Sequence, residues 1–256
     1  MRKRVSAAVA TGALALTGLA VPAAHAAPAD EQIKLSNIKV NGGKDVAIGT
    51  GNKKFTITFD ASHSHNIDPD PHITAWKGSM GILLPEEFGH NHCKETSATK
   101  SSCTATFNVN PQDYDIDNSE AGTWNTEVFI SSQEPSFDFL EKDNIKSFKI
   151  LRAAKLTANA SPEPIKKGKT LTITGALTRA NWDTYKYAGY TSQPVKLQFK
   201  KKGAATYTDV KTVKSDSRGN LKTTVKANVD GSYRYSFAGT STTPAVSASG
   251  DAVDVT

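Results

Sequence analysis

The residues with the clearest potential for chemistry are histidines that lie close together. Five of the six histidines fall between positions 63 and 92: His63, His65, His72, His90 and His92. Four of them form two His-x-His pairs, and residues two apart in an extended segment face the same side, so each pair presents two imidazoles together. Imidazole is the commonest protein ligand for zinc, copper and nickel. The cluster predicts a Zn, Cu or Ni site; the alternative is a polar loop that binds such ions only as a histidine tag does.

A second group consists of carboxylates at a spacing of two. Asp113, Asp115 and Asp117 alternate with other residues, and Glu120 follows. The pattern resembles the start of an EF-hand loop, and carboxylate oxygens are ligands that Ca²⁺ takes. Asn118 stands where that loop needs glycine, however, and the bidentate glutamate of the loop is missing. The segment is predicted to hold Ca²⁺ weakly, or to be an acidic turn between strands that holds no ion.

Four aromatic residues form the third group. Trp182, Tyr185, Tyr187 and Tyr190 fall within one short polar segment between two predicted strands. Exposed aromatic rings beside polar side chains can stack against the C–H groups of sugar rings. The segment therefore predicts a glycan-binding platform. The alternative is that two or three of the rings close the end of a hydrophobic core.

Motifs of known catalytic chemistry are missing from the sequence. There is no Gly-x-Ser-x-Gly elbow, no His-Glu-x-x-His, no Cys-x-x-Cys and no glycine-rich phosphate loop. We therefore expect a protein that is not an enzyme and requires no cofactor. The basic stretch Lys200–Lys202 is expected to be a solvated hairpin turn, so nucleic acid is not a predicted partner.

The elements that must position these residues are strands, because the dominant period of the sequence is two. Apolar side chains alternate with polar ones in short segments separated by Gly, Pro, Asn and Asp, which is typical of half-buried antiparallel strands. A single helical turn is expected at residues 136–142. The clearest alternating sets are Phe55, Ile57 and Phe59; Cys103, Ala105, Phe107 and Val109; Trp124, Thr126, Val128 and Ile130; Leu171 and Ile173; Val195, Leu197 and Phe199; and Tyr233, Tyr235 and Phe237.

The sequence divides into two halves of opposite charge. Residues 27–153 carry 12 Lys and Arg against 18 Asp and Glu, whereas residues 154–256 carry 16 against 7. In each half a glycine turn leads into a strand headed by an aromatic residue, as at Trp124 and Tyr233. This is typical of the corner before a late strand of immunoglobulin-like sandwiches. We predict an all-β chain with two tandem antiparallel Ig-like β-sandwiches, 27–153 and 154–256.

The amino terminus and the two cysteines indicate the cellular compartment in which the protein is expected to fold. Arg2–Arg4, an apolar run to Val21 and Ala24-His25-Ala26 have the form of a cleaved secretory signal peptide covering residues 1–26. The run is too short to serve as a transmembrane anchor, so a secreted, extracellular protein is expected. In that compartment Cys93 and Cys103 are predicted to form a disulfide.

The second half resembles a bacterial secreted Ig-like module in residues 161–182, 189–203 and 230–255. The whole chain resembles small exported two-domain proteins of Gram-positive bacteria, whose function is unassigned and some of which are labelled calcium-binding. The resemblance implies the fold and export, and no active-site residue. We expect a non-catalytic binding or structural protein of unknown ligand, with a cell-wall polymer or another surface protein as partner; metal binding and glycan binding are the alternatives.

Overall fold

The computed structural model describes the chain from Gln32 onward and is almost entirely β-structure. Strands make up 57% of it and helices 4%, which confirms the all-β prediction. Among the described residues no helix has the length and apolar character needed to cross a bilayer. The predicted signal peptide, residues 1–26, lies outside the described part. Described are residues 32–256, apart from 80, 88, 89, 91 and 136.

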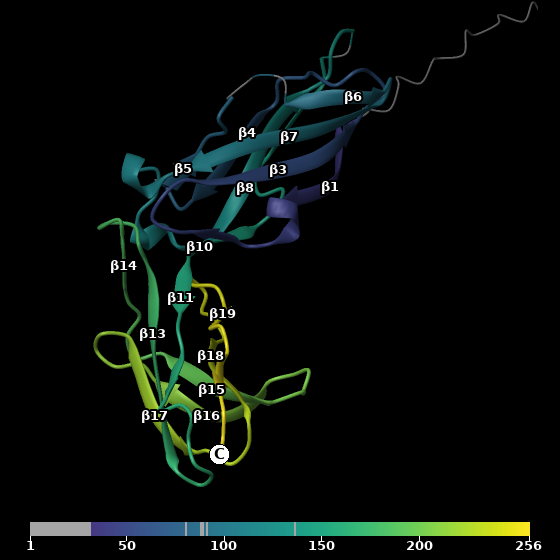
Figure 1. Ribbon diagram of the computed structural model, residues 1–256. Coiled ribbons are helices and arrows are strands. Elements are labelled where there is room, and N and C mark those ends of the chain that lie inside the picture. The colour runs from purple at the N-terminus through teal and green to yellow at the C-terminus, as the bar shows by residue number, and fades with distance from the viewer. Residues whose placement is uncertain (1–31, 80, 88–89, 91, 136) are drawn as a thin grey trace, which may run out of the picture. The chain divides into compact units, whose positions relative to one another are not determined.

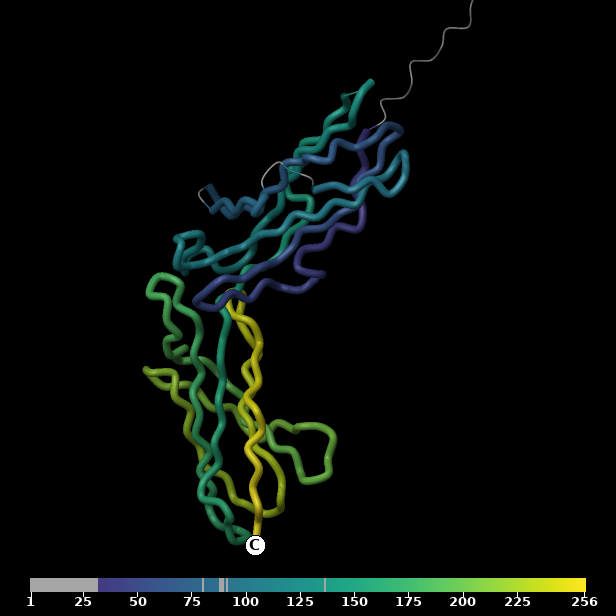
Figure 2. Tube along the Cα trace, turned by 45° about the horizontal axis from the view of Figure 1, so that its top comes forward, coloured from purple at the N-terminus to yellow at the C-terminus, as the bar shows by residue number. Residues whose placement is uncertain are grey.

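The first half of the chain contributes a four-stranded antiparallel sheet. The strands stand in the order β1-β3-β7-β6, and β3 and β7 run side by side over their full length (Figure 1, Figure 2). Their bounds are β1 Lys34–Val40, β3 Lys53–Ser62, β7 Lys100–Val109 and β6 Cys93–Ser97.

The second sheet of this half has the order β2-β10-β8-β4-β5, and β9 also pairs with β8. All its pairings are antiparallel except that of β2 with β10. The two sheets pack against each other, as the Phe55 and Phe148 ring centroids, 5.8 Å apart, show. The bounds are β2 Val46–Ile48, β10 Phe148–Arg152, β8 Gly122–Ser131, β4 His72–Lys77, β5 Gly81–Leu83 and β9 Phe139–Lys142.

The second half of the chain repeats this plan with two further sheets. In one, β13 pairs with β11, β12, β14 and β17; the other has the order β16-β15-β18-β19, with β20 also on β18. The bounds of the first sheet are β11 Ala154–Leu156, β12 Asn159–Ser161, β13 Thr170–Asn181, β14 Lys186–Gly189 and β17 Asn220–Lys226. Those of the second are β15 Pro194–Lys201, β16 Thr208–Lys214, β18 Gly231–Phe237, β19 Val246–Ser247 and β20 Asp251–Val253.

The strand order identifies both halves as immunoglobulin-like sandwiches. In the first half, β1-β3-β7-β6 corresponds to strands A-B-E-D, and β10-β8-β4 to G-F-C. In the second, the strands around β13 correspond to A-B-E, and β16-β15-β18 to C′-C-F. Both predicted glycine corners, at Gly122 and Gly231, open the F strand.

The predicted alternation within strands is confirmed by burial. In β3, Phe55, Ile57 and Phe59 are buried between less buried neighbours, and Tyr233, Tyr235 and Phe237 in β18 follow the same rule. Successive side chains of a strand point to opposite faces, so a period of two places one set in the core.

The predicted disulfide is also confirmed, and one local prediction is wrong. Cys93 on β6 and Cys103 on β7 stand directly opposite each other and are bonded. The helical turn expected at 136–142 is not formed where the structure describes it, because Phe139–Lys142 pair with β8 as β9. The short 3₁₀ helices are Asn41–Gly43, Pro111–Asp113 and Asn118–Glu120.

The two hydrophobic cores do not divide at the predicted domain boundary. Among the described residues, the strand pairings stay within either residues 34–152 or residues 154–253. Ala180 and Trp182, however, lie in the second half of the sequence and are buried in the core of the first sandwich. The boundary at 153/154 therefore separates the sheets of the two halves but not their hydrophobic cores. Independent folding of the two halves stays a prediction.

Candidate functional site

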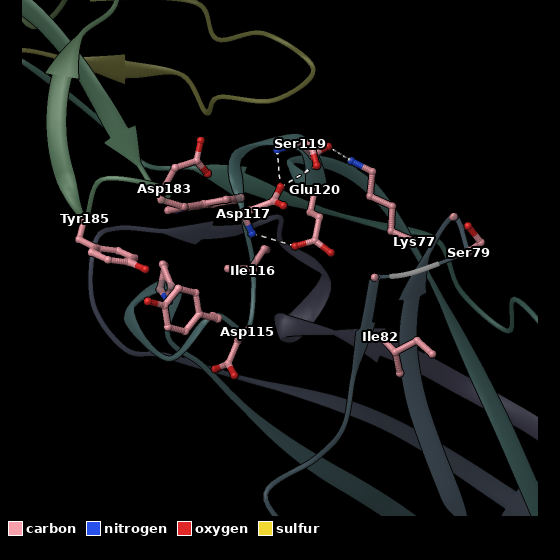
Figure 3. Close-up of a pocket in the computed structure, with 15 residues that line it drawn as sticks. Lys77, Ser79, Ile82, Asp115, Ile116, Asp117, Ser119, Glu120, Asp183 and Tyr185 are labelled. Atoms are coloured by element: carbon pink, nitrogen blue, oxygen red, sulfur yellow. Dashed lines mark hydrogen bonds between the residues drawn. The ribbon is translucent and has the colours of Figure 1, made fainter.

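A pocket of about 1000 Å³ lies among the described residues. It is lined by residues from three segments: residues 77–79 and 81–82 around the β4–β5 turn, residues 111–120 before β8, and residues 182–185 after β13. Figure 3 shows these side chains facing a common space. The third segment lies more than 60 residues from the others, so only the tertiary structure brings the three together.

The acidic segment is folded into a tight turn by Asn110. The Asn110 side-chain oxygen accepts a hydrogen bond from the backbone N–H of Gln112, at 3.2 Å. Its backbone N–H donates to Asp115 Oδ2 at 2.8 Å, and its side-chain amide donates to Asp113 Oδ2 at 2.7 Å. Asx turns of this kind are the usual way in which Asn and Asp fix a loop. Asp115 thereby reaches the pocket, while Asp113 stays outside its lining.

Asp117 and Glu120 form a capping box on the last 3₁₀ helix before β8. Asp117 Oδ1 accepts hydrogen bonds from the backbone N–H and the hydroxyl of Ser119, at 2.7 and 2.6 Å. Glu120 Oε2 accepts the backbone N–H of Asp117 at 2.8 Å. Figure 3 shows these bonds in the middle of the pocket. The hydroxyl of Ser119 is the main cause of a lowered pKa of Asp117, because it stabilises the ionised carboxylate.

The third segment is tied to the acidic one through Asn118. The Asn118 backbone N–H donates to Asp183 Oδ1 at 3.0 Å, and its side-chain amide donates to the oxygens of Asp183 and Asn181. In return, its side-chain oxygen accepts the backbone N–H of Trp182 at 2.9 Å. One asparagine therefore fixes the positions of two of the pocket walls.

Lys77, at the end of β4, supplies the pocket's cation. Its ammonium group donates to the carbonyl oxygens of Ser119 and Ala121, at 2.9 and 2.7 Å. Burial lowers the pKa of Lys77, and the nearby carboxylates of Glu120 and Asp117 oppose that shift. Lys77 therefore stabilises the segment at Ser119–Ala121 through hydrogen bonds and also contributes a positive charge to the pocket.

Two tyrosines supply the aromatic part of the pocket. The ring centroids of Tyr114 and Tyr185 lie 6.4 Å apart in an edge-to-face arrangement, and Tyr114 is 86% exposed. Both residues have positive φ, 63° and 57°, a conformation that is rare for bulky side chains and that often marks functional loops. The backbone thus holds two large rings at the edge of the pocket instead of in a core.

The carboxylates keep unused hydrogen-bonding capacity. Asp115 and Glu120 each accept a hydrogen bond through one oxygen, and the second oxygen of each receives none from any described residue. A Cβ atom at position 81 would lie only 2.7 Å from Glu120 Oε1. Gly81 therefore leaves room for the Glu120 carboxylate. The pocket is therefore rich in acceptors.

The predicted aromatic platform of four rings is not formed. Trp182 reaches the base of the pocket but is only 1% exposed, because its ring lies in the first core and its indole N–H donates to the carbonyls of Gly49 and Ile48, at 2.9 and 3.3 Å. Tyr187 packs against the first core and Tyr190 against the second. Of the four, Tyr185 is the one whose ring is partly open to the pocket.

Tyr114 and Lys77 are among the pocket members that sequence reasoning missed. Tyr114 had a detectable signal, since it lies inside the acidic segment and an aromatic residue between aspartates is unusual in a plain turn. Lys77 had none, because a lysine at a strand end resembles any solvated lysine. Its role depends on carbonyls more than 40 residues away.

The first His-x-His pair packs within the first half of the chain. The rings of His63 and His65 are 5.6 Å apart. The His63 side chain is buried, with Nε2 3.1 Å from Asp138 Oδ2, and its Nδ1 accepts the backbone N–H of His65 at 3.2 Å. Both ring nitrogens of His63 therefore already have protein partners.

The other three histidines occupy different surroundings. His92 is buried with Nδ1 3.3 Å from the Thr104 carbonyl, and its Nε2 has no hydrogen-bond partner among the described residues. His90 is exposed, and His72 lies against the ring of Phe129. Within the described residues, no three or more His, Cys, Asp or Glu side chains form a group arranged to hold a metal ion, and this includes the predicted calcium set.

A smaller hollow of about 280 Å³ lies on the outer face of β4, β8 and β9. The ring of Phe129 stacks there on that of Phe139, which is 69% exposed, at a centroid distance of 6.1 Å. This second hollow has a smaller volume and fewer polar lining residues than the first pocket. Its lining residues are His72, Thr74, Glu127, Phe129 and Glu141.

Comparison with known proteins finds no family model that matches the chain and no match among curated protein sequences. Among solved structures, dimeric latent PorU of Porphyromonas gingivalis is 9% identical over 91% of this chain, with a TM-score of 0.33, and the present chain spans only 21% of PorU. Mouse nectin-like molecule 4 is 13% identical over 86% of this chain and 65% of its own length, with a TM-score of 0.28. The D00-D0 domain of intimin is 12% identical over 86% and 99%, with the same score. Likeness at this level carries no functional argument, so the immunoglobulin-like assignment rests on the strand order.

Proposed function

We propose that this chain is a non-catalytic, extracellular glycan-binding protein and that the glycan binds in the pocket lined by Tyr114 and Tyr185. One observation carries the proposal. The fold brings two partly or fully exposed tyrosine rings next to the carboxylates of Asp115 and Glu120, whose second oxygens accept no hydrogen bond from the described residues. Tyr185 comes from a segment that lies far from the other groups in the sequence.

The chemistry of a sugar matches the two features. The C–H faces of a pyranose ring pack on aromatic rings, and its hydroxyls donate to acceptors such as carboxylate oxygens. Asp115 and Glu120 offer such oxygens. The volume of about 1000 Å³ is at the upper end of small-molecule pockets and suits an oligosaccharide more than a single sugar.

A binding role fits the way in which the carboxylates are held. Asp117 and Glu120 are bound into a capping box, and Asp115 into an Asx turn, so these groups are fixed in position by backbone N–H groups. Rigid acceptors favour recognition, because little side-chain entropy is lost when a ligand binds. The signal-like amino terminus supports an extracellular location for this activity.

Calorimetric titration of the purified chain with a panel of oligosaccharides tests the proposal. At least one oligosaccharide should bind, and Tyr185→Ala should weaken its binding about tenfold or more, because a stacked aromatic ring is lost. Phe139→Ala is the matched control, since Phe139 is also an exposed aromatic residue but lies outside the pocket. The proposal fails if no oligosaccharide binds, or if both variants bind as tightly as the parent chain.

A further inference from the structure

The charge of the pocket indicates the charge of the sugar that it would bind. Four carboxylates line the pocket, and among the described lining residues Lys77 is the one cationic side chain. We infer, resting on the proposed function, that the glycan carries free amino groups, as in an oligomer of glucosamine. The four carboxylates are those of Asp115, Asp117, Glu120 and Asp183.

The balance of donors and acceptors supports a ligand that mainly donates. Lys77 already gives hydrogen bonds to two backbone carbonyls, so little of its donor capacity is left. The second carboxylate oxygens of Asp115 and Glu120, by contrast, accept nothing from the described residues. A hydroxyl both donates and accepts, whereas an ammonium group has three donors and no acceptor. An amino sugar therefore satisfies these oxygens better than a neutral sugar does, with shorter, charge-assisted hydrogen bonds.

The tyrosines favour the same ligand. An ammonium group within about 6 Å of the centre of an aromatic ring is attracted by the negative face of the ring. Tyr114 meets Tyr185 edge to face and is 86% exposed, so its ring is accessible to a ligand. The carboxylate of Asp117 also keeps its charge in more acidic solution than an ordinary aspartate, since the hydrogen bond from the Ser119 hydroxyl lowers its pKa.

The experiment compares two tetrasaccharides that differ in the amino groups alone. Calorimetry on the full chain at about 50 mM salt should show β-1,4-linked glucosamine tetramer binding at least about tenfold more tightly than the N-acetylglucosamine tetramer. At about 0.5 M salt this preference should shrink, because screening weakens attraction between exposed charges.

Isosteric amide variants locate the effect in the pocket. Asp115→Asn and Glu120→Gln retain an oxygen that can accept the same backbone N–H, but each removes one negative charge. Each should reduce the preference for the amine several-fold. Asp113→Asn is the matched control, because it removes the same charge from the same loop outside the pocket lining, and it should leave the preference within about twofold.

The outcomes separate the inference from the proposed function. If the two tetrasaccharides bind equally and Tyr185→Ala weakens both, the pocket binds glycans and the inference about charge is overturned. The inference is also overturned if Asp113→Asn acts as strongly as Asp115→Asn, because binding then follows net charge and not pocket contacts. If no sugar in the panel binds, the proposed function itself falls.

Discussion

At the scale of single residues, Trp182 shows how far a side chain can depart from its local sequence. Its neighbours in sequence form a polar loop, yet its ring is buried in the core of the first sandwich. Its indole N–H is paired with the carbonyls of Ile48 and Gly49. The residue therefore contributes to stability and forms the base of the pocket without offering an open ring face.

Replacement of this tryptophan should be costly. Trp182→Ala is expected to lower the free energy of unfolding by about 3–5 kcal/mol, because it leaves a cavity and removes the indole donor of the Gly49 carbonyl. Urea denaturation measures the change. Tyr114→Ala is the control and should change stability by less than about 0.5 kcal/mol, since Tyr114 is 86% exposed. Equal stability of the two variants would show that Trp182 is not a core residue.

The hydroxyl of Ser119 should set the acidity of Asp117. Its hydrogen bond is the largest cause of the lowered pKa of this carboxyl, so Ser119→Ala should raise that pKa toward its ordinary value. A lowered folded-state pKa adds stability above the unfolded-state value, and this stability is lost as pH falls through the folded-state pKa. Ser119→Ala should therefore reduce stability near neutral pH and leave it unchanged at strongly acidic pH.

Carboxyl-carbon NMR titration of Asp117 measures this effect directly. Ser79→Ala is a suitable control, because Ser79 lines the same pocket but does not contribute to the lowered pKa of Asp117. An unchanged midpoint in Ser119→Ala would show that the backbone hydrogen bonds alone hold the carboxylate ionised.

At the scale of elements, the disulfide fixes an edge strand. Cys93 lies on β6, which pairs with β7 alone and forms the edge of its sheet. Replacing both cysteines by alanine should lower the free energy of unfolding by about 2–3 kcal/mol, because a cross-link over a short loop restricts the unfolded chain by about that amount. Thermal unfolding with and without reductant is the measurement. Reductant should lower the melting temperature of the parent chain and have no effect on the double variant.

At the scale of the whole molecule, hydrogen bonds connect the two halves of the described chain in addition to the peptide link between them. Arg152 Nε donates to the Ala180 carbonyl at 2.7 Å, and the backbone N–H of Ala180 donates to the Ala153 carbonyl at 2.8 Å. Together with Trp182, these contacts make one core depend on residues from both halves. Residues 32–256 accordingly form a single compact unit.

Unfolding should reflect that shared core. The full chain should unfold in one calorimetric transition, whereas fragments 27–153 and 154–256 should each melt below it, because a cut exposes Trp182 and empties its site. Tryptophan fluorescence of fragment 154–256 should be red-shifted relative to that of the full chain. Two transitions in the full chain that match those of the fragments would instead support two independent domains.

The sequence by itself determined the elements of this protein. Alternation of apolar and polar residues specified strands such as β3 and β18, because a strand has a period of two whatever it packs against. Two cysteines in one chain left a single intramolecular pairing to predict. The glycine turns before Trp124 and Tyr233 marked the same corner in both sandwiches, and these local rules sufficed for the fold class.

The tertiary structure alone decided which loops form the pocket. The acidic segment and the aromatic segment were predicted as separate candidates for calcium and glycan, and the fold places Asp115 and Tyr185 in one site. No local rule connects residues about 65 positions apart, because their distance depends on how the two sandwiches meet through Asn118 and Trp182. Burial of Trp182 has the same origin, since a polar neighbourhood in sequence does not reveal a core supplied by distant strands.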